Sequence, residues 1–410
     1  MRHERARHDF SIVTDALKQY QRKTGKQTLA LGGWEVEDAH IRPPAWLLRQ
    51  LASIRHRPLG YSYPHDFAVA KARAAETLGW NVTLGGERLH AAQVAVLQNS
   101  TQGLLLALAA LRARGVTRVV VAAPSYYAAI DACQHLGLET DIVPARDFIT
   151  GALDIERIAA ALRIGTGAAL LLTNPAYSLG VEHSWDHLRA LLDALPAALP
   201  VLLDETRLGL SWTSEAPWYA ADFPPNVLVL RSPSKIFLVN GLKTSFLYGP
   251  APVIRDVERL HEALLGSVAG HAEAVALAYL ETWHAWITEL ERDHNGPLRR
   301  WRHALVSRFT AHLDAIRPRL EACGYTLSPI DSGPYVLAGA MHSAAPDLDC
   351  ARVAHDAGVL LMDGRYFFHE SPGWSGFRLN LCGDPAHTRA ALARVFPAAS
   401  PVSASGRVRG

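Results

Sequence analysis

Short apolar runs alternate with helical patterns from about Ala92 to Arg231. The apolar runs are rich in Val, Leu and Ala and lack polar alternation, which is typical of strands buried on both faces of a sheet. Repeated strand–helix units predict a mostly parallel sheet with right-handed crossovers. The predicted strands cover residues 94–97, 118–123, 141–143, 168–173, 201–204 and 227–231, and the predicted helices cover 101–113, 127–136, 155–162 and 185–195.

The pattern changes after Gly249. A long helical stretch runs from 253 toward 316 with an interruption near 295–297, and short strands follow around 325–327, 335–337 and 377–381. We therefore expect an α/β fold in which a mostly parallel sheet flanked by helices is joined to a smaller α+β domain. The expected division is an N-terminal segment 1–60 that contributes to the small domain, a large domain 61–290, a C-terminal small domain 291–398 and a flexible tail 399–410.

Composition excludes several classes of partner. The 41 basic and 39 acidic residues leave a net charge of +2, too small to hold a nucleic-acid backbone or an anionic membrane. No apolar run is long enough to cross a bilayer, and the charged first ten residues are not expected to form a secretory signal.

The four scattered cysteines favour a reducing, cytoplasmic setting. His183 and His187 have the spacing of metal ligands but no third ligand, so we predict no metal site.

The segment Ser232–Pro233–Ser234–Lys235 directly follows a predicted strand. A partly desolvated lysine amine can form an imine with an aldehyde cofactor. The hydroxyls of Ser232 and Ser234 can bond a phosphate, and Lys243 can supply a cation to the same group. Taken alone, this segment is equally typical of an ordinary surface loop.

Asp204 ends another predicted strand, and parallel sheets bind ligands at the carboxyl ends of their strands. Opposite a pyridine nitrogen, a carboxylate holds the ring protonated and electron-withdrawing. The segment 99–103, which includes Ser100, Thr101 and Gln102, lies between a strand and a helix, where free backbone amides attract an anion. The alternative for Asp204 is an acidic pair in a loop, and the alternative for the segment 99–103 is a plain helix cap.

Tyr126 and Arg378 complete the candidate residues. Tyr126 follows a strand and can stack on a cofactor ring, or it can belong to the core. Arg378 lies in an apolar strand and needs a partner there, which is either a substrate carboxylate or an internal salt bridge.

In this order and spacing, the motifs resemble those of the class I/II aminotransferases, which are fold-type I enzymes that use pyridoxal 5'-phosphate. The resemblance extends from about residue 29 to 396. It implies that Lys235 carries the cofactor as a Schiff base and that Asp204 meets the pyridine nitrogen. The residues that it places around the cofactor are Ser100, Thr101, Gln102, Tyr126, Asn174, Tyr177, Arg207, Ser232, Ser234 and Lys243, with Tyr61 serving the neighbouring subunit. The residues that it assigns to the substrate are Arg378, Gly33 and Trp34.

The chain departs from the family pattern close to the expected cofactor. Tyr177 stands where the family has an asparagine, and Arg207 stands where it has a tyrosine; both usual residues bond the phenolic oxygen of the cofactor. A guanidinium at Arg207 would stabilise a phenolate more strongly than a phenol does. Lys243 replaces the family's phosphate arginine, and Asp66 replaces a glycine.

The resemblance implies a homodimeric enzyme that transfers the amino group of an α-amino acid to a 2-oxo acid. The departures keep open a specialised reaction on the same fold, such as β- or γ-elimination or replacement, carbon–carbon bond formation, or oxidation. A rival from another class is a non-catalytic regulator that binds pyridoxal phosphate. We do not expect it, because the resemblance begins too early to leave room for a preceding DNA-binding module.

Overall fold

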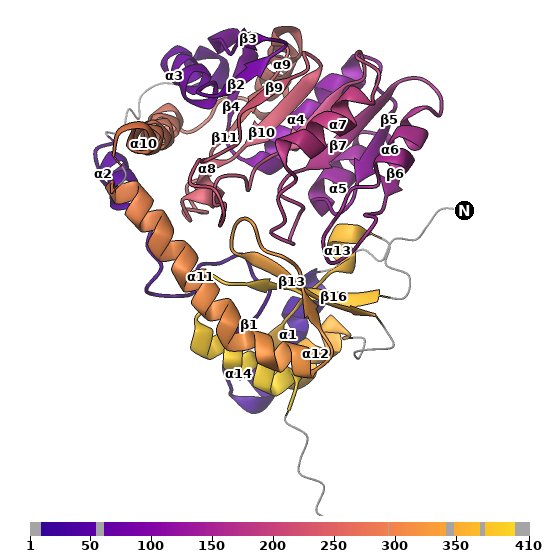
Figure 1. The fold of residues 1–410 in the computed structure, drawn as a ribbon, viewed down its shortest axis with the longest axis vertical. Coiled ribbons are helices and arrows are strands. Elements are labelled where there is room, and N and C mark those ends of the chain that lie inside the picture. Colours follow the sequence, from indigo (N-terminus) through magenta and orange to yellow (C-terminus); the bar gives the residue numbers. More distant parts are fainter. Residues whose placement is uncertain (1–9, 55–60, 294, 342–347, 370–373, 398–410) are drawn as a thin grey trace, which may run out of the picture.

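The computed structural model describes residues 10–54, 61–293, 295–341, 348–369 and 374–397. Figure 1 shows two bodies, a larger one around a central sheet and a smaller one that contains both described ends of the chain. No helix in these ranges combines the length and the apolar character needed to cross a membrane.

The large body is built on a seven-stranded sheet that is parallel except for one strand. In spatial order its strands are β4 (Val94–Leu97), β11 (Ser245–Tyr248), β10 (Val227–Arg231), β8 (Val201–Asp204), β7 (Ala168–Thr173), β5 (Arg118–Ala122) and β6 (Glu139–Val143). The antiparallel strand is β11, which pairs with β4 and β10. The prediction of a mostly parallel α/β sheet is confirmed.

Helices cover both faces of this sheet, as its apolar strands require. Within β5, Val119 and Val121 join the core against one helical layer, whereas Val120 joins the core on the other face. Successive side chains of a strand point to opposite faces, so an uninterrupted apolar strand needs cover on both. The helices that follow the parallel strands are α4 (Ser100–Ala113), α5 (Tyr127–His135), α6 (Ile155–Leu162), α7 (Trp185–Asp193) and α8 (Pro233–Ile236), and α9 (Ala251–Leu265) packs on α4.

The small body contains a four-stranded sheet with antiparallel neighbours. Its strands, in spatial order, are β12 (Thr326–Leu327), β13 (Tyr335–Met341), β16 (Trp374–Asn380) and β15 (Met362–Asp363). The N-terminal segment joins this body, because β1 (Leu29–Ala30) pairs with β14 (Val359–Leu360) and α1 (Phe10–Thr24) packs on α12 (Cys350–Ala357). The long helix α11 (Pro297–Ala322) runs along one side, and α14 (Pro385–Val395) packs against it.

The remaining elements border these two sheets. They are α2 (Ala45–Ala52), α3 (Ala68–Leu78), α10 (Ala272–Arg292), α13 (Arg365–Phe368) and a three-stranded sheet of β3 (Glu87–Arg88), β2 (Val82–Leu84) and β9 (Ala221–Phe223).

One prediction about local structure was wrong, and one strand was not predicted. The helical stretch predicted from 253 onward breaks a first time at Gly266, whose φ of 67° no helix accommodates. The strand β11 was not predicted, because its residues follow Lys243 and Thr244 without a strand-like pattern before them.

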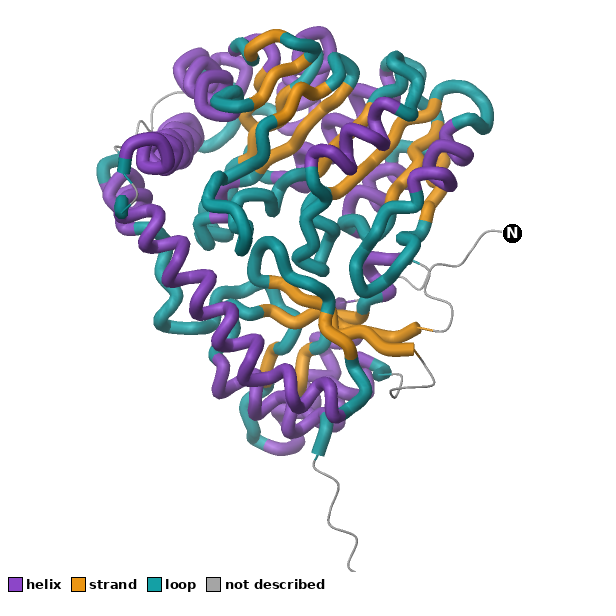
Figure 2. The backbone as a smooth tube through the Cα atoms, in the orientation of Figure 1, coloured by secondary structure: helices purple, strands orange, loops and turns teal. Residues whose placement is uncertain are grey.

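The loops after β4, β5, β7, β8 and β10 leave the sheet on the side that faces the small body (Figure 2). Parallel strands place these loops side by side at their carboxyl ends. The segments that begin at Asn99, Pro124, Asn174, Glu205 and Ser232 therefore gather at one edge of the sheet.

We expect the core beneath α10 to depend on Trp283, which is 1% exposed and packs near Trp218, Phe237 and Phe246. Trp283→Ala should lower the free energy of unfolding by about 3–5 kcal/mol, because it leaves a large cavity. The control Leu264→Ala, at a side chain 62% exposed, should change that free energy by less than ~0.5 kcal/mol. Urea unfolding of both variants checks this, and equal effects would contradict it.

Candidate active site

The amine of Lys235 lies at the edge of the sheet where the loops meet. Its Nζ donates hydrogen bonds to Ser100 Oγ at 2.9 Å and to Thr206 Oγ1 at 3.1 Å. Burial, with the nearby Arg207 cation as the next cause, lowers the pKa of Lys235 to about 7. The amine is therefore available in its neutral, nucleophilic form near neutral pH.

A cavity of about 500 Å³ opens in front of this amine. Most of the residues predicted for the site share its wall, although they come from six separate segments of the chain. The residues of the wall are Trp34, Glu35, Asn99, Ser100, Thr101, Tyr126, Tyr127, Tyr177, Arg207, Ser232, Ser234, Lys235, Asn240, Gly241, Lys243 and Tyr335. Among the described residues, six of the predicted site residues lie outside that wall, namely Gly33, Tyr61, Gln102, Asn174, Asp204 and Arg378.

One end of the cavity is rich in hydroxyl groups. Ser232 Oγ donates to the carbonyl of Thr244 at 2.9 Å and lies 3.1 Å from Ser234 Oγ. Ser100 begins α4, so unpaired backbone amides of the first turn lie at this end. Thr101 Oγ1 lies 3.3 Å from the hydroxyl of Tyr126. Hydroxyls, amides and a cation form a chemically suitable site for a phosphate.

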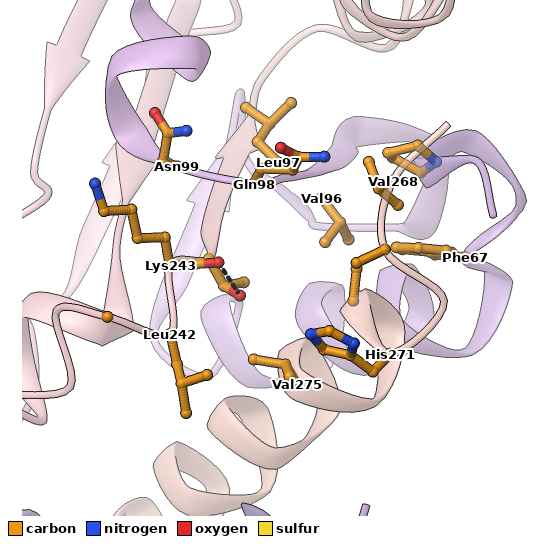
Figure 3. A pocket seen from close by; sticks show the side chains of 15 residues that line it. Phe67, Val96, Leu97, Gln98, Asn99, Leu242, Lys243, Val268, His271 and Val275 are labelled. Carbon is orange, nitrogen blue, oxygen red and sulfur yellow. Dashed lines mark hydrogen bonds between the residues drawn. The ribbon is translucent and has the colours of Figure 1, made fainter. Parts of the chain in front are cut away.

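A second cavity, of about 290 Å³, adjoins this end and shares Asn99, Gly241 and Lys243 with the first. Figure 3 shows the Lys243 side chain extending along this cavity with its amine toward Asn99. The opposite wall is apolar and includes Phe67, Val268 and Val275. The exposed Lys243 therefore belongs to both cavities.

Gln102 does not take the position expected of a phosphate contact. Its amide oxygen accepts a hydrogen bond from the backbone of Gln98 at 2.9 Å, and its Nε2 lies 3.3 Å from His261 Nε2. The backbone of Gln102 donates to Asn99 Oδ1 at 2.9 Å, which caps α4. Its side chain is thus engaged in holding the start of the helix.

Asp204 is 3% exposed and accepts a hydrogen bond from the backbone of Thr206 at 3.0 Å. Thr206 also contacts Lys235, so the carboxylate and the amine are connected through one residue. The next residue, Glu205, makes a buried ion pair with Arg231 at 2.8 Å; their side chains are 0% and 1% exposed. This pair joins the end of β8 to the end of β10, directly before the segment that carries Lys235.

The hydroxyl of Tyr219 donates to Glu205, and it lies 3.4 Å from the side-chain amide of Asn174. Asn174 also bonds both backbone groups of His183, at 2.8 Å and 3.2 Å. One polar network therefore connects three loops of the site. Sequence reasoning named Glu205 only as the neighbour of Asp204 in a possible acidic loop pair, and it did not single out Arg231 or Tyr219. A charged residue at the end of a buried strand nevertheless indicates a buried partner.

Tyr177 and Arg207, which depart from the family pattern, are neighbours. The ring of Tyr177 is 3% exposed, its centroid lies 5.3 Å from that of Tyr126, and burial raises the pKa of its hydroxyl. The Arg207 guanidinium lies 5.8 Å from the Tyr177 ring centroid and 4.2 Å from that of Tyr335. Arg207 Nε is buried without a hydrogen-bond partner among the described residues.

Arg378 is completely buried and is not part of the cavity wall, and the internal salt bridge considered for it is absent among the described residues. Its guanidinium donates to the carbonyl of Gly32 at 2.5 Å and 3.1 Å and to that of Gly33 at 3.2 Å. It also donates to Ser178 Oγ at 3.3 Å and lies 4.8 Å from the Trp34 ring centroid. The backbone of the N-terminal segment thus satisfies most of its donors.

Tyr61 is 86% exposed and lies outside the cavity of its own chain. His183 and His187 have ring centroids 5.7 Å apart, and burial lowers the pKa of His183 to about 4. No cluster of three or more potential metal ligands occurs within the described ranges.

The lowered pKa of Lys235 predicts a distinct acylation profile for the cofactor-free protein. Only the neutral amine reacts with acetic anhydride, so modification of Lys235 should level off above about pH 7. An ordinary surface lysine, with a pKa of about 10.4, becomes steadily more reactive up to pH 10. Mass spectrometry of the labelled peptides checks this, and a Lys235 rate that still climbs between pH 8 and 9 would contradict it.

The ion pair between Glu205 and Arg231 predicts a large effect of removing one partner. Glu205→Gln should lower the free energy of unfolding by about 3–5 kcal/mol, because Arg231 is left charged and buried. The control Asp193→Asn breaks a pair with Arg189 in which both side chains are 65% exposed, and should cost less than ~0.5 kcal/mol. Chemical denaturation measures both, and a Glu205 effect no larger than the control would show that the pair is energetically neutral.

Comparison with solved structures finds the same fold. A double mutant of the aspartate aminotransferase of Thermus thermophilus superposes with a TM-score of 0.75 at 19% identity, covering 94% of this chain and 95% of the other. An aminotransferase from Mycobacterium tuberculosis gives a TM-score of 0.73 at 20% identity, covering 94% and 95%. At this level of identity, the likeness establishes the fold.

Curated relatives match over part of their length. An aromatic amino acid aminotransferase of Nocardia farcinica is 29% identical over 245 residues, covering 57% of this chain and 62% of the relative. Histidinol-phosphate aminotransferase 1 of Thiobacillus denitrificans is 29% identical over 224 residues, covering 53% and 54%. The aligned part therefore spans somewhat more than half the length of these relatives. The family model described as aminotransferase class I and II matches residues 28–395, almost the whole chain. The resemblance drawn from the sequence motifs is thereby confirmed, and the chain belongs to the class I and II aminotransferase family.

Proposed function

We propose that this protein transfers the amino group of an α-amino acid to a 2-oxo acid, with pyridoxal 5'-phosphate attached to Lys235. The observation that carries the proposal is the amine of Lys235 at the cavity floor, with its pKa lowered to about 7. Membership in the class I and II aminotransferase family supports it. A lysine with an ordinary pKa would be almost entirely protonated at pH 7 and unable to attack a carbonyl.

The residues present fit this cofactor. Ser100, Thr101, Ser232, Ser234 and Lys243 would hold its phosphate at the hydroxyl-rich end of the cavity. Tyr126 would contact the ring, and Asp204 would meet the ring nitrogen. Pyridoxal phosphate, when bound, supplies an aldehyde that takes up amino groups and a protonated ring that withdraws electrons from the substrate's α-carbon.

Lys235 would then move a proton at the α-carbon of the amino acid. Its near-neutral pKa suits a general base at physiological pH, since both protonation states are populated. The hydroxyls of Ser100 and Thr206 orient the amine, each within 3.1 Å. The ion pair between Glu205 and Arg231 keeps the two strand ends in register, and with them the carboxylate of Asp204.

The cavity favours a substrate with an aromatic or other large apolar side chain. Five aromatic side chains belong to its wall: Trp34, Tyr126, Tyr127, Tyr177 and Tyr335. Several of the curated relatives are aromatic amino acid aminotransferases, which supports testing aromatic donors first.

We propose a homodimer as the working unit. Tyr61 matches a family residue that serves the neighbouring subunit, and its ring is 86% exposed and outside its own cavity. A two-fold interface would allow the Tyr61 of each subunit to reach the other site.

A specialised reaction on the same fold is the second proposal, and the Arg207 and Tyr177 substitutions favour it. A cation at the cavity wall, here Arg207, changes where negative charge is stabilised after the proton has left the α-carbon of the substrate. Elimination or replacement at the β- or γ-carbon, carbon–carbon bond formation and oxidation each begin with the same proton transfer and differ in their products.

The test adds phenylalanine, tyrosine, tryptophan or aspartate to the protein loaded with pyridoxal phosphate. Amino transfer should bleach the visible band and release one equivalent of 2-oxo acid. Lys235→Ala should slow this by roughly 10²–10⁴-fold, the usual contribution of a general base, while Lys26→Ala serves as a control. Ammonia or peroxide released while the visible band persists would instead identify elimination or oxidation, because the cofactor's aldehyde is regenerated when the nitrogen leaves as ammonia. A protein that never acquires the visible band would refute the proposal.

A further inference from the structure

Among the described residues, the wall of the cavity at Lys235 contains a single carboxylate, that of Glu35. Glu35 belongs to the N-terminal segment and directly follows Trp34, which lines the same cavity. Glu35 is exposed to solvent, whereas Lys235 is only partly exposed. A residue that is exposed and also lines a cavity lies at its mouth, so Glu35 marks the opening of the site.

The backbone that carries Glu35 is held from both bodies of the protein. The carbonyl of Glu35 accepts a hydrogen bond from Asn380 Nδ2 at 2.8 Å, and Asn380 ends β16 of the small body. The carbonyl of Trp34 accepts one from Asn240 Nδ2 at 3.3 Å, and Asn240 lies in the loop after α8 of the large body. The fold therefore fixes where the segment of Glu35 meets the cavity, and little backbone freedom remains to be lost when a ligand binds.

The carboxylate of Glu35 is not engaged within the described part of the chain. Its backbone carbonyl has a partner there, but its side chain takes part in no ion pair and no hydrogen bond. A carboxylate offers two oxygens, and both can accept hydrogen bonds. A ligand that carries a donor group toward the mouth would meet an acceptor that no other protein group occupies.

The surrounding charges favour a neutral donor over a cation. The small body supplies two aromatic rings to the wall, those of Trp34 and Tyr335. The Arg378 guanidinium lies 4.8 Å from the Trp34 ring centroid, and the Arg207 guanidinium lies 4.2 Å from that of Tyr335. A cationic side chain placed against either ring would approach a second cation, which is unfavourable. A neutral O–H or N–H group avoids this repulsion.

We infer that Glu35 is a specificity residue, which accepts a hydrogen bond from an O–H or N–H group at the far edge of an aromatic substrate side chain. The α-carbon of the substrate has to lie at the Lys235 amine, so its side chain extends away from that amine. The inference rests on the proposed function and narrows its substrate class. Aromatic amino acids with a ring hydroxyl or a ring N–H are preferred, and a plain phenyl ring is disfavoured because it offers the carboxylate no donor.

The experiment compares 3-(4-hydroxyphenyl)propionate with 3-phenylpropionate, which differ only in the ring hydroxyl and have no amino group to react. Calorimetry with the protein loaded with pyridoxal phosphate gives both dissociation constants. The wild type should bind the hydroxylated ligand roughly 3- to 10-fold more tightly, the effect of one hydrogen bond. Glu35→Ala should reduce this ratio to about one, whereas Glu35→Gln, which keeps an acceptor oxygen, should retain part of it.

Glu37→Ala is the matched control, because Glu37 is exposed on the same segment, lies outside the cavity wall and carries the same charge. The ratio of the two dissociation constants should stay at its wild-type value in this variant. Loss of charge alone would strengthen both carboxylate ligands equally and leave the ratio unchanged. A ratio that falls as far in Glu37→Ala as in Glu35→Ala would therefore overturn the inference.

Two further results would also overturn it, namely a wild type with no preference for the hydroxylated ligand and a Glu35→Ala variant that keeps the preference. Amino transfer from tyrosine and from phenylalanine separates this failure from that of the proposed function. Transfer with an unchanged kcat/KM ratio of the two donors in Glu35→Ala would leave the proposed function standing and contradict the role of Glu35. If no transfer occurs, the proposed function fails, and the calorimetric ratio still tests Glu35.

Discussion

The ion pair between Glu205 and Arg231 is the contact on which the geometry of the site depends. Both charges are removed from water at the ends of adjacent parallel strands, so each is tolerable only while the other stays within hydrogen-bond distance. Glu205 follows Asp204, and Arg231 precedes the segment of Lys235. Because Glu205 and Arg231 must stay together, the separation between the Asp204 carboxylate and the Lys235 amine is fixed, although the two groups belong to different loops.

Much of the large sheet was predictable because its strands are apolar on both faces. The bounds of β4, β7, β8 and β10 agree with the sequence analysis, since each strand is a continuous run of buried and mostly apolar residues. The strand β11 was missed because its identity depends on pairing with β4 and β10, which sequence pattern does not reveal. The break at Gly266 depends on a single backbone angle.

The set of residues around the cavity was also largely predictable, but their contacts were not. Motifs at the ends of parallel strands must meet, which accounts for Ser100, Tyr126 and Lys235. The orientation of Arg378 depends on the carbonyl of Gly32, which is 346 positions away in the sequence. Gln102 faces His261 for a similar reason, since α9 packs on α4 only in the folded chain. The motifs therefore indicate which residues meet at the cavity, whereas packing decides which hydrogen-bond donors and acceptors each of them contacts.

The lowered pKa of Lys235 also has a thermodynamic consequence for the fold. In the unfolded chain this amine binds a proton up to a pKa of about 10.4, whereas in the folded chain it releases the proton near 7. Between these values the unfolded state holds more protons, so linkage makes the native state relatively less stable as the pH falls. The destabilisation is complete below about pH 7 and disappears above about pH 10. Burial of the Lys235 amine therefore destabilises the fold at neutral pH. Any ligand that binds the neutral amine shifts the folding equilibrium toward the native protein.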